Sequence, residues 1–380
     1  MLLRSMYAQN YRSLRSIRMD LAGVNVFIGE NGVGKSNLYR ALQLVQAAVQ
    51  GTLAYEIAAE GGMASALWTG PRRRDEKNFR IRFEVEVLDE ERAVTFRYWV
   101  EAGLRPPIDA AGFAFEPQVK AEELSVETGS RPVTMMKRAG PGIMVRGTKG
   151  RMEEYPEKAM TSETAIALLG DAGHYPEAGA FRRLVDGWRF FHGFRTDRDS
   201  ALRRPCLAVT SPLLDQDGGN MAAVFATLEH TRGDTVDLDR AVASALGGAK
   251  LVVPEPGEYA EFGLIFPDFP KRVFQPRELS DGQIRFLGLA AALMSYRQPP
   301  LIALNEPEAS LHPDMLPPLA DMIAQASRSS QVWIVTHSQQ FASAVEERCG
   351  VGPKRVIRKH GATWIEGMRL TGVVDEEDDE

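Results

Sequence analysis

The hydrophobic pattern of the chain alternates between strand-like and helix-like stretches. Near the start, apolar positions favour strands at 2–7 and 16–21, around a turn-like Asn-Tyr-Arg-Ser at 10–13. A third apolar strand over 24–28 runs into a glycine-rich segment, and apolar residues then recur at helical spacing from Asn37. The pattern therefore predicts a strand, a loop and a helix in direct succession.

A different period begins after residue 71. Apolar and charged residues alternate strictly over 79–87, which predicts a half-buried antiparallel strand with 94–100 as its partner. Two short runs at 133–138 and 143–146 flank a Gly-Pro-Gly turn and predict a hairpin. This part of the chain is therefore expected to be rich in β-structure.

From 161 to about 246 the spacing turns mainly helical. Ser162 is the expected N-cap of a first helix, and further helices are predicted at 180–191 and 220–230. Between them lies His192, which either faces a ligand or caps a helix. No sustained heptad pattern occurs, so we expect no long coiled coil.

The pattern after residue 270 returns to alternating helices and strands. Ser280 is well placed as the N-cap of a helix over 284–295, and a buried strand at 301–304 ends in an Asn-Glu-Pro-Glu run. A further helix and a strand at 332–335 follow, and the strand ends at Thr-His-Ser.

The segment Gly29–Ser36, GENGVGKS, fits the phosphate-loop pattern in the strand–loop–helix context that this pattern requires. Its glycines let successive backbone N–H groups turn toward phosphate oxygens, and the helix N-terminus adds a partial positive charge. Lys35 is expected to reach the β and γ phosphates, and Ser36 to ligate Mg²⁺.

Composition and charge limit the cellular compartment and the partners to be expected. The 380 residues are 44% apolar and 25% charged, and the two cysteines form no CxxC pair, which favours a cytoplasmic protein without a disulfide framework or zinc site. No apolar run is long enough to span a bilayer. The net charge of −6 argues against a surface that attracts nucleic acid everywhere. Residues 72–74, Arg-Arg-Arg, are either a solvated cluster or a contact for a phosphate backbone.

Taken in order, five features resemble the ABC-type ATPase superfamily: the phosphate loop, the Leu-Ser-Asp-Gly-Gln signature at 279–283, the strand ending in Glu306, the segment after it and the switch His337. Within it, the Asn-Tyr-Arg-Ser-Leu start and the Glu-Pro-Glu-Ala-Ser-Leu-His-Pro run resemble the RecF/SMC-like branch, in particular the bacterial "AAA family, ABC-like" predicted ATPases. The resemblance covers residues 1–70 and 270–345.

The resemblance implies roles for individual residues. Glu306 would activate the attacking water, and His337 would contact the γ-phosphate. Ser36 and Asn305 would hold Mg²⁺. The residues implied to contact ATP are Gly29, Asn31, Gly32, Gly34, Lys35, Ser36, Asn37, Ser280, Gly282 and Gln283.

In such proteins two nucleotides are sandwiched between two head-to-tail copies. Ser280 and Gly282 would therefore serve ATP bound by the partner. Glu308 and Ser310 would lie in the segment that crosses the interface.

Two features of the sequence depart from the family pattern. Asn305 stands where an aspartate usually holds Mg²⁺ through water, so metal affinity and hydrolysis are expected to be weaker. No glutamine is clearly assigned to the loop that senses Mg²⁺. Gln118 and the segment 68–70 are the candidates.

The expected fold is α/β: a P-loop NTPase of ABC-ATPase type, with a two-lobed mixed sheet, an antiparallel β-subdomain and a helical subdomain. The ATPase core is predicted in two parts, 1–70 and 266–370. Between them we expect a β-rich subdomain at 71–160 and a mainly helical region at 161–265, and after them an acidic tail at 371–380.

Three functions stay open. The first is an ATP-dependent homodimer that hydrolyses ATP in DNA maintenance or phage defence, with DNA as a partner. The second is a regulatory ATPase that works through a separate effector protein. The third is the energy subunit of a transporter, which would need a membrane partner.

Overall fold

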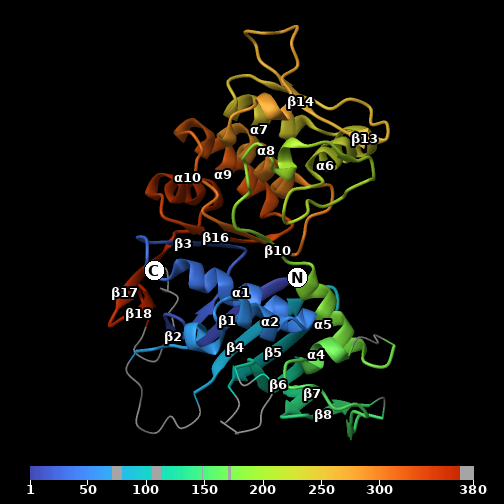
Figure 1. Cartoon of the computed structure of the whole chain (residues 1–380), viewed down its shortest axis with the longest axis vertical. Helices are drawn as coiled ribbons and strands as arrows, with labels where there is room; N and C mark the ends of the chain where they lie inside the picture. Colours follow the sequence, from blue (N-terminus) through green and yellow to red (C-terminus); the bar gives the residue numbers. More distant parts are fainter. Residues whose placement is uncertain are drawn as a thin grey trace. The chain divides into compact units, whose positions relative to one another are not determined.

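The computed structural model describes residues 1–70, 79–104, 113, 115–129, 131–147, 149–169 and 173–368. The predicted Arg72–Arg74 cluster and acidic tail lie outside these ranges. By its internal contacts the chain forms two compact units, the first made of 1–22, 29–188 and 354–380, and the second of 23–28 and 189–353. Figure 1 labels their elements.

The first unit is built on an eight-stranded antiparallel sheet of order β2-β1-β4-β5-β6-β7-β8-β9. Its strands are β1 Leu2–Tyr11, β2 Leu14–Asp20, β4 Ile81–Asp89, β5 Val94–Gly103, β6 Gln118–Glu127, β7 Pro132–Ala139, β8 Gly142–Arg146 and β9 Met152–Glu154. The alternating pattern correctly predicted β4 and its pairing with β5, because Phe83 and Val85 are buried on one face. The predicted hairpin of β7 and β8 is also confirmed.

Helices cover the apolar face of this sheet. They are α1 Lys35–Gln50, α2 Leu53–Ala59, α3 Gly62–Ala66, α4 Ala165–Leu168 and α5 Pro176–Asp186, and a hairpin of β17 Lys354–Lys359 and β18 Ala362–Ile365 completes the unit. The Phe181 ring of α5 packs on Phe96 and Tyr98 of β5, with centroids 5.8 and 5.2 Å apart. Gln46 of α1 donates to the carbonyls of Val185 and Trp188, which fixes α1 against the end of α5.

The second unit contains four parallel strands in the order β10-β15-β16-β3: β10 Arg189–Phe191, β15 Leu301–Asn305, β16 Gln331–Thr336 and β3 Val24–Ile28. Its helices are α6 Met221–Thr227, α7 Val236–Ala245, α8 Asp281–Met294, α9 Leu316–Ala326 and α10 Gln339–Cys349. Short helical turns are η1 Ala201–Arg203, η2 Leu228–Arg232, η3 Pro276–Glu278 and η4 Pro313–Met315. Two small ladders pair β11 Cys206–Leu207 with β13 Tyr259–Ala260, and β12 Lys250–Val252 with β14 Gly263–Ile265.

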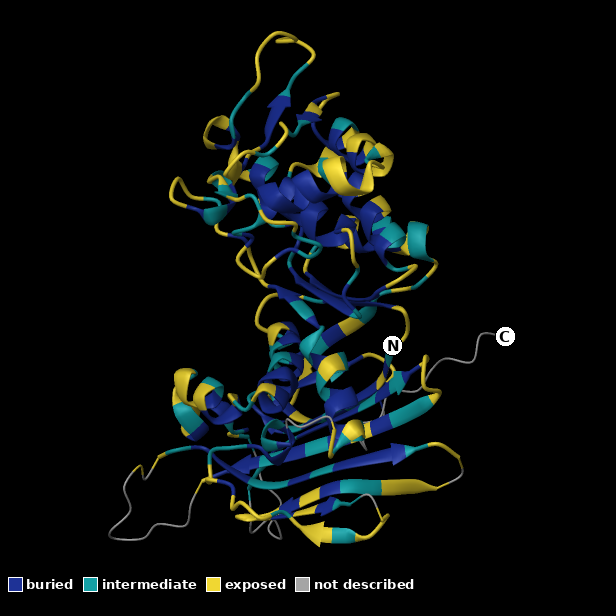
Figure 2. Ribbon diagram, turned by 90° about the vertical axis from the view of Figure 1, so that its right-hand side faces the viewer, coloured by how far each residue is buried: buried dark blue, intermediate teal, exposed yellow. Residues whose placement is uncertain are grey.

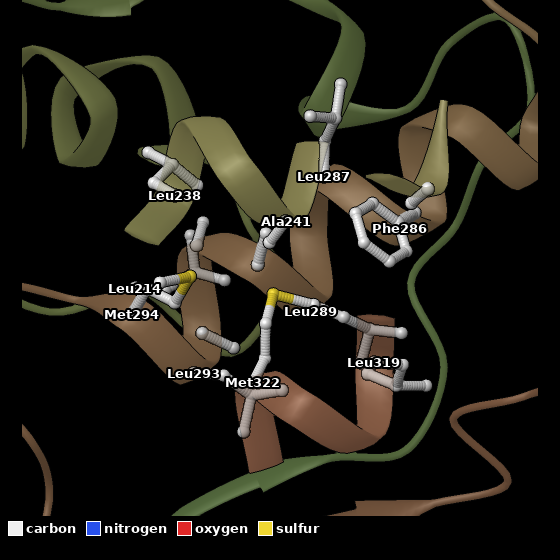
Figure 3. Close-up of a cluster of buried hydrophobic side chains, with 14 of the residues drawn as sticks. Leu214, Leu238, Ala241, Phe286, Leu287, Leu289, Leu293, Met294, Leu319 and Met322 are labelled. Carbon is white, nitrogen blue, oxygen red and sulfur yellow. The ribbon is translucent and has the colours of Figure 1, made fainter. Parts of the chain in front are cut away.

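Helix α8 lies at the centre of the apolar core of the second unit. Figure 3 shows its Leu289 and Leu293 beside Met322 of α9, with Ala241 of α7 close by. All of α8 from Phe286 to Met294 is buried, which accounts for its small and apolar sequence. In Figure 2 the dark-blue buried stretches fall within strands and helices and the yellow exposed ones mainly within loops.

Two of the predicted helices need correction. Ser162 is not an N-cap: α4 begins at Ala165, whose backbone N–H, like that of Ile166, donates to the buried Glu122 carboxylate. The helix predicted at 180–191 ends at Asp186, and residues 189–191 form strand β10 instead, because they pair with β15. Long-range partners outweigh local spacing at both places.

The predicted absence of a long coiled coil fits the ranges that the structure describes, where the longest helix is α1 with 16 residues. Nor is any helix within those ranges long and apolar enough to cross a membrane. The mixed α/β fold with an antiparallel subdomain is as predicted.

Candidate nucleotide-binding site

The glycine-rich loop connects β3 to α1 and needs its glycines. Gly32 and Gly34 have φ angles of 81° and 101°, in the left-handed region that favours glycine. A Cβ atom at Gly34 would lie 1.9 Å from the hydroxyl of Thr363, and one at Gly29 would lie 2.2 Å from the carbonyl of Val356. The hairpin β17–β18 therefore packs on a loop that only glycine can form.

Lys35 lies inside this loop. Its side chain is buried, and its Nζ donates to the carbonyls of Gly29 and Glu30 at 2.6 and 2.7 Å. Helix α1 starts at Lys35 without a side-chain cap and without an acidic residue in its first turn. The loop thus holds an ammonium group beside the uncapped N-terminus of a 16-residue helix, an arrangement that suits a phosphate anion.

Side chains from both ends of the chain brace the loop. Asn37 donates to the hydroxyl of Ser13 at 2.7 Å, Ser13 lies 2.6 Å from the hydroxyl of Thr363, and Thr363 donates to the carbonyl of Val33 at 2.9 Å. Sequence reasoning missed Ser13 and Thr363. They are 350 positions apart, so no local pattern links them.

The remaining predicted residues follow the carboxyl ends of neighbouring strands in the second unit. In the parallel register Asn305 of β15 lies opposite Val335 of β16, and Thr336 lies opposite Ile28 of β3. Glu306 and His337 come directly after these strand ends. Carboxyl ends of parallel strands share one edge of a sheet, and such edges commonly hold ligands.

Glu306 adopts a constrained backbone. Its φ is 48°, its N–H donates to the carbonyl of Val335 at 2.7 Å, and its own carbonyl accepts from Arg285 at 2.9 Å. Its side chain is 34% exposed, and Oε1 lies 3.6 Å from Nδ1 of His337. The backbone is therefore fixed while the carboxylate stays accessible to water.

Glu308 is buried behind His337. It accepts hydrogen bonds from the hydroxyl of Thr336 and, at 3.3 Å, from the backbone N–H of His337, and its Oε1 lies 3.6 Å from Nδ1 of His337. Burial lowers the pKa of the nearby Arg285 guanidinium, although Glu308 and Glu306 act in the opposite direction. The side chain of Glu308 thus supports His337, and the crossing of its segment to a partner stays a prediction.

Asn305 contacts His192, whose role the sequence left open. Its Nδ2 lies 2.9 Å from Nδ1 of His192, which directly follows β10, so His192 lies at the strand ends beside Asn305. Oδ1 of Asn305 is buried and finds no hydrogen-bond partner among the described residues. A buried amide oxygen without a partner is available to a metal ion or its water.

The signature residues begin helix α8 as predicted. Ser280 is the N-cap: its hydroxyl accepts from the N–H of Gln283 at 3.3 Å, while Gln283 Oε1 accepts from the N–H of Ser280 at 2.9 Å. A Cβ at Gly282 would lie 2.9 Å from the carbonyl of Ser310, so this glycine permits close packing on the segment after Glu306.

The two candidates for the Mg²⁺-sensing glutamine lie in the first unit. Gln118 begins β6, is buried, and accepts from Lys120 at 2.7 Å. Trp68 is buried, and its backbone N–H donates to the carbonyl of Asn10. Which of them, if either, senses a metal stays a prediction.

Two sequence families match the chain at its two motif-bearing regions. Residues 1–85 match an "AAA ATPase domain", and residues 180–343 match "AAA domain, putative AbiEii toxin, Type IV TA system". Together they span the phosphate loop, the signature, Glu306 and His337.

Individual relatives are more distant. The thiamine import ATP-binding protein ThiQ of Chelativorans sp. (strain BNC1) is 32% identical over 90 residues, which are 23% of this chain and 36% of that protein. The chain therefore matches about a third of that relative's length.

Among solved structures, an SMC head bound to the C-winged helix domain of ScpA matches with a TM-score of 0.53 at 14% identity, over 96% of this chain and 97% of the other. The Pyrococcus furiosus SMC head with an extended coiled coil, bound to the C-terminal domain of ScpA, matches with a TM-score of 0.50 at 14% identity. The match covers 96% of this chain and 95% of the other.

These matches confirm the class that the motifs predicted. The chain matches AAA ATPase domains in both regions that carry the motifs, which supports ATP hydrolysis, and it has the fold of an SMC head domain.

Proposed function

We propose that this chain binds ATP with Mg²⁺ and hydrolyses it in a site that a second copy completes. The observation that carries the proposal is the strand register of the second unit. Ile28 lies opposite Thr336 and Asn305 opposite Val335, so β3, β15 and β16 end at one edge of the sheet, and the phosphate loop, Glu306 and His337 follow these three ends in the sequence.

The loop residues would bind the nucleotide. Gly29, Asn31, Gly32, Gly34 and Asn37 would present backbone and amide groups to the phosphates, and the ammonium of Lys35 would leave its loop carbonyls for a phosphate oxygen. The hydroxyl of Ser36 and the Oδ1 of Asn305, which has no hydrogen-bond partner within the described ranges, would hold the metal. Bound Mg²⁺ would neutralise charge on the phosphates.

Glu306 is the group best placed to orient water. Its backbone is held at both N–H and carbonyl, and its carboxylate is accessible. It would accept a hydrogen bond from the attacking water, while His337, supported by Glu308, would contact the γ-phosphate. Removing either side chain would slow hydrolysis without preventing ATP from binding.

The exposed start of α8 would act on ATP bound by the partner. Ser280 and Gly282 precede a buried 14-residue helix, and their backbone N–H groups carry its partial positive charge. Gln283 fixes the hydroxyl of Ser280 by the reciprocal cap. ATP would thus join two copies head to tail, and hydrolysis would release them.

The ATPase rate and its dependence on protein concentration test this function. Lys35→Ala should reduce the rate at least about a hundredfold, because the lysine and the loop are needed to hold the phosphates. The control is Lys354→Ala, which removes a half-buried lysine that bonds to the carbonyl of Asp20 and is not among the residues proposed to bind ATP. The rate per chain should rise with concentration as dimers form. A rate unaffected by Lys35→Ala, or one independent of concentration, would contradict the proposal.

For the cellular role we propose DNA maintenance or phage defence, either on DNA directly or through a separate effector protein. The family matched at 180–343 supports the defence arm, because its description names a toxin–antitoxin system. The description is that of the family, so the role itself needs an experiment.

Assays of DNA binding and DNA cleavage distinguish action on DNA from action through an effector protein. If DNA is the partner, it should stimulate the ATPase with a steep salt dependence, and an absence of binding at low salt would remove DNA from the proposal. We expect no intrinsic nuclease activity, because within the described ranges no group of three His, Cys, Asp or Glu side chains could hold a metal. DNA cleavage by pure protein that survives Lys35→Ala would show this expectation to be wrong.

A further inference from the structure

One arginine of the second unit, Arg203, contacts the turn before α8 with nearly its whole guanidinium. It is the last residue of η1, and its side chain is only 7% exposed. Nε donates to the carbonyl of Thr196 at 2.8 Å, and Nη1 donates to those of Pro276 and Leu279 at 2.7 Å each. Nη2 pairs with the carboxylate of Asp281 at 2.7 Å.

These contacts lie on both sides of Ser280. Leu279 precedes it and Asp281 follows it, and both Leu279 and Ser280 have extended backbones with ψ of 150° and 161°. Arg203 therefore holds the peptide unit before Ser280 through the Leu279 carbonyl and the side chain after it through the Asp281 carboxylate. Ser280 itself is exposed, and its hydroxyl accepts the hydrogen bond of its cap.

The same turn also packs on the segment after β15. Gly282 leaves room for the carbonyl of Ser310, and Arg285 donates to the carbonyl of Glu306. The start of α8 is thus held by two sets of contacts, one from η1 and one from the Glu306 segment. Loss of the Arg203 contacts would remove the first set while the second stays in place.

We propose that Arg203 is a positioning residue for the signature turn: it presents Ser280 and Gly282 to the nucleotide of the partner. This inference rests on the proposed function, because it assumes that ATP joins two copies. Lysine cannot replace it, since the four bonds leave three different nitrogen atoms of a planar group toward carbonyls and a carboxylate in different directions.

The adjacent Arg204 provides a matched control. Its side chain is 62% exposed and makes a surface pair with Asp199 at 3.6 Å. Such exposed pairs contribute little. A change at Arg204 removes the same charge from the same segment without touching the turn.

The test combines Arg203→Lys, Arg203→Ala and Arg204→Ala with Glu306→Gln, and measures two quantities for each. The first is binding of a fluorescent ATP analogue to single chains at low protein concentration. The second is the dimer dissociation constant in saturating ATP and Mg²⁺. The Arg203 changes should raise the dimer constant at least about tenfold and leave nucleotide binding within about twofold, because Arg203 bonds to Thr196, Pro276, Leu279 and Asp281, which are not among the residues proposed to bind the chain's own ATP. Arg204→Ala should change neither.

The outcomes are distinguishable. If Glu306→Gln alone forms no dimer with ATP, the proposed function fails and this inference fails with it. If that variant forms a dimer that the Arg203 changes do not weaken, the inference alone is overturned. An equal loss of nucleotide binding and dimerisation would show a merely structural role and also overturn it. If Arg203→Ala does not fold, Arg203→Lys decides, because it keeps the charge and the aliphatic chain.

Discussion

Asn305 is the residue at which this chain departs most clearly from the family that its motifs resemble. An amide stands at the end of β15, bonded through Nδ2 to His192, with Oδ1 buried and without a hydrogen-bond partner among the described residues. The neutral oxygen can accept a metal-bound water but adds no charge. The sequence alone predicted a weaker metal site, and the contact with His192 explains how the amide is held there.

Asn305→Asp tests this view. A carboxylate would add a negative charge where the proposed Mg²⁺ is held, so the Mg²⁺ concentration that gives half of the maximal ATPase rate should fall about tenfold, since ligand charge tunes affinity. Asn305→Ala should raise it. A Mg²⁺ dependence that is the same in all three proteins would show that this position does not contribute to the metal site.

At this scale, sequence reasoning was right where the cause is local. The cap at Ser280 was predicted from its place at the start of an apolar helix, and the structure shows its partner, Gln283, only three residues away. Local patterns do not show contacts such as Thr363 on the phosphate loop or Arg203 on the signature turn. These contacts join residues far apart in sequence, so only the fold reveals them.

Among the elements, α4 shows most clearly why a local prediction fails. This four-residue helix begins where the fully buried Glu122 of β6 accepts hydrogen bonds from Ala165 and Ile166, at 2.6 and 3.0 Å, and from the hydroxyl of Tyr98 at 2.9 Å. Its cap is therefore supplied from 43 residues away. Burial raises the pKa of Glu122, and these three hydrogen bonds act against that rise.

Glu122→Gln should destabilise the chain by about 1–3 kcal/mol, because both carboxyl oxygens of Glu122 accept hydrogen bonds and the amide NH₂ that would replace one of them cannot. A carboxyl whose pKa is raised by folding binds its proton more tightly in the folded state. The stabilisation that Glu122 contributes in the wild type is therefore greatest at a pH below 4.5, the ordinary pKa of a glutamate. It declines as the pH rises through the raised pKa of the folded state. The stability difference between wild type and the variant should shrink over that window.

Urea unfolding at several pH values measures this difference. The matched control is Glu123→Gln, because the neighbouring Glu123 side chain is 23% exposed and lies 3.8 Å from Lys137. The control should change stability by less than about 1 kcal/mol. A difference for Glu122→Gln that grows with pH would contradict the assigned direction of the pKa.

For the whole molecule, the strands that carry motifs were predicted best. β3, β15 and β16 are buried along their whole length and mostly apolar, as expected for strands buried on both faces of a parallel sheet. The short β10 was missed, because three residues after a helix carry no clear period. The partition into two compact units, one of which takes up residues 23–28, follows from tertiary contacts that no sequence boundary marks.

The central claim is that ATP joins two copies of this chain, with Glu306 acting on the ATP of its own chain and Ser280 on that of its partner. Sedimentation velocity of Glu306→Gln, with and without ATP and Mg²⁺, tests it most directly. With hydrolysis blocked, ATP should convert the variant from a monomer of 42.0 kDa to a stable dimer, and the added change Lys35→Ala or Ser280→Arg should abolish the dimer. A Glu306→Gln protein that binds ATP and remains a monomer would contradict the account.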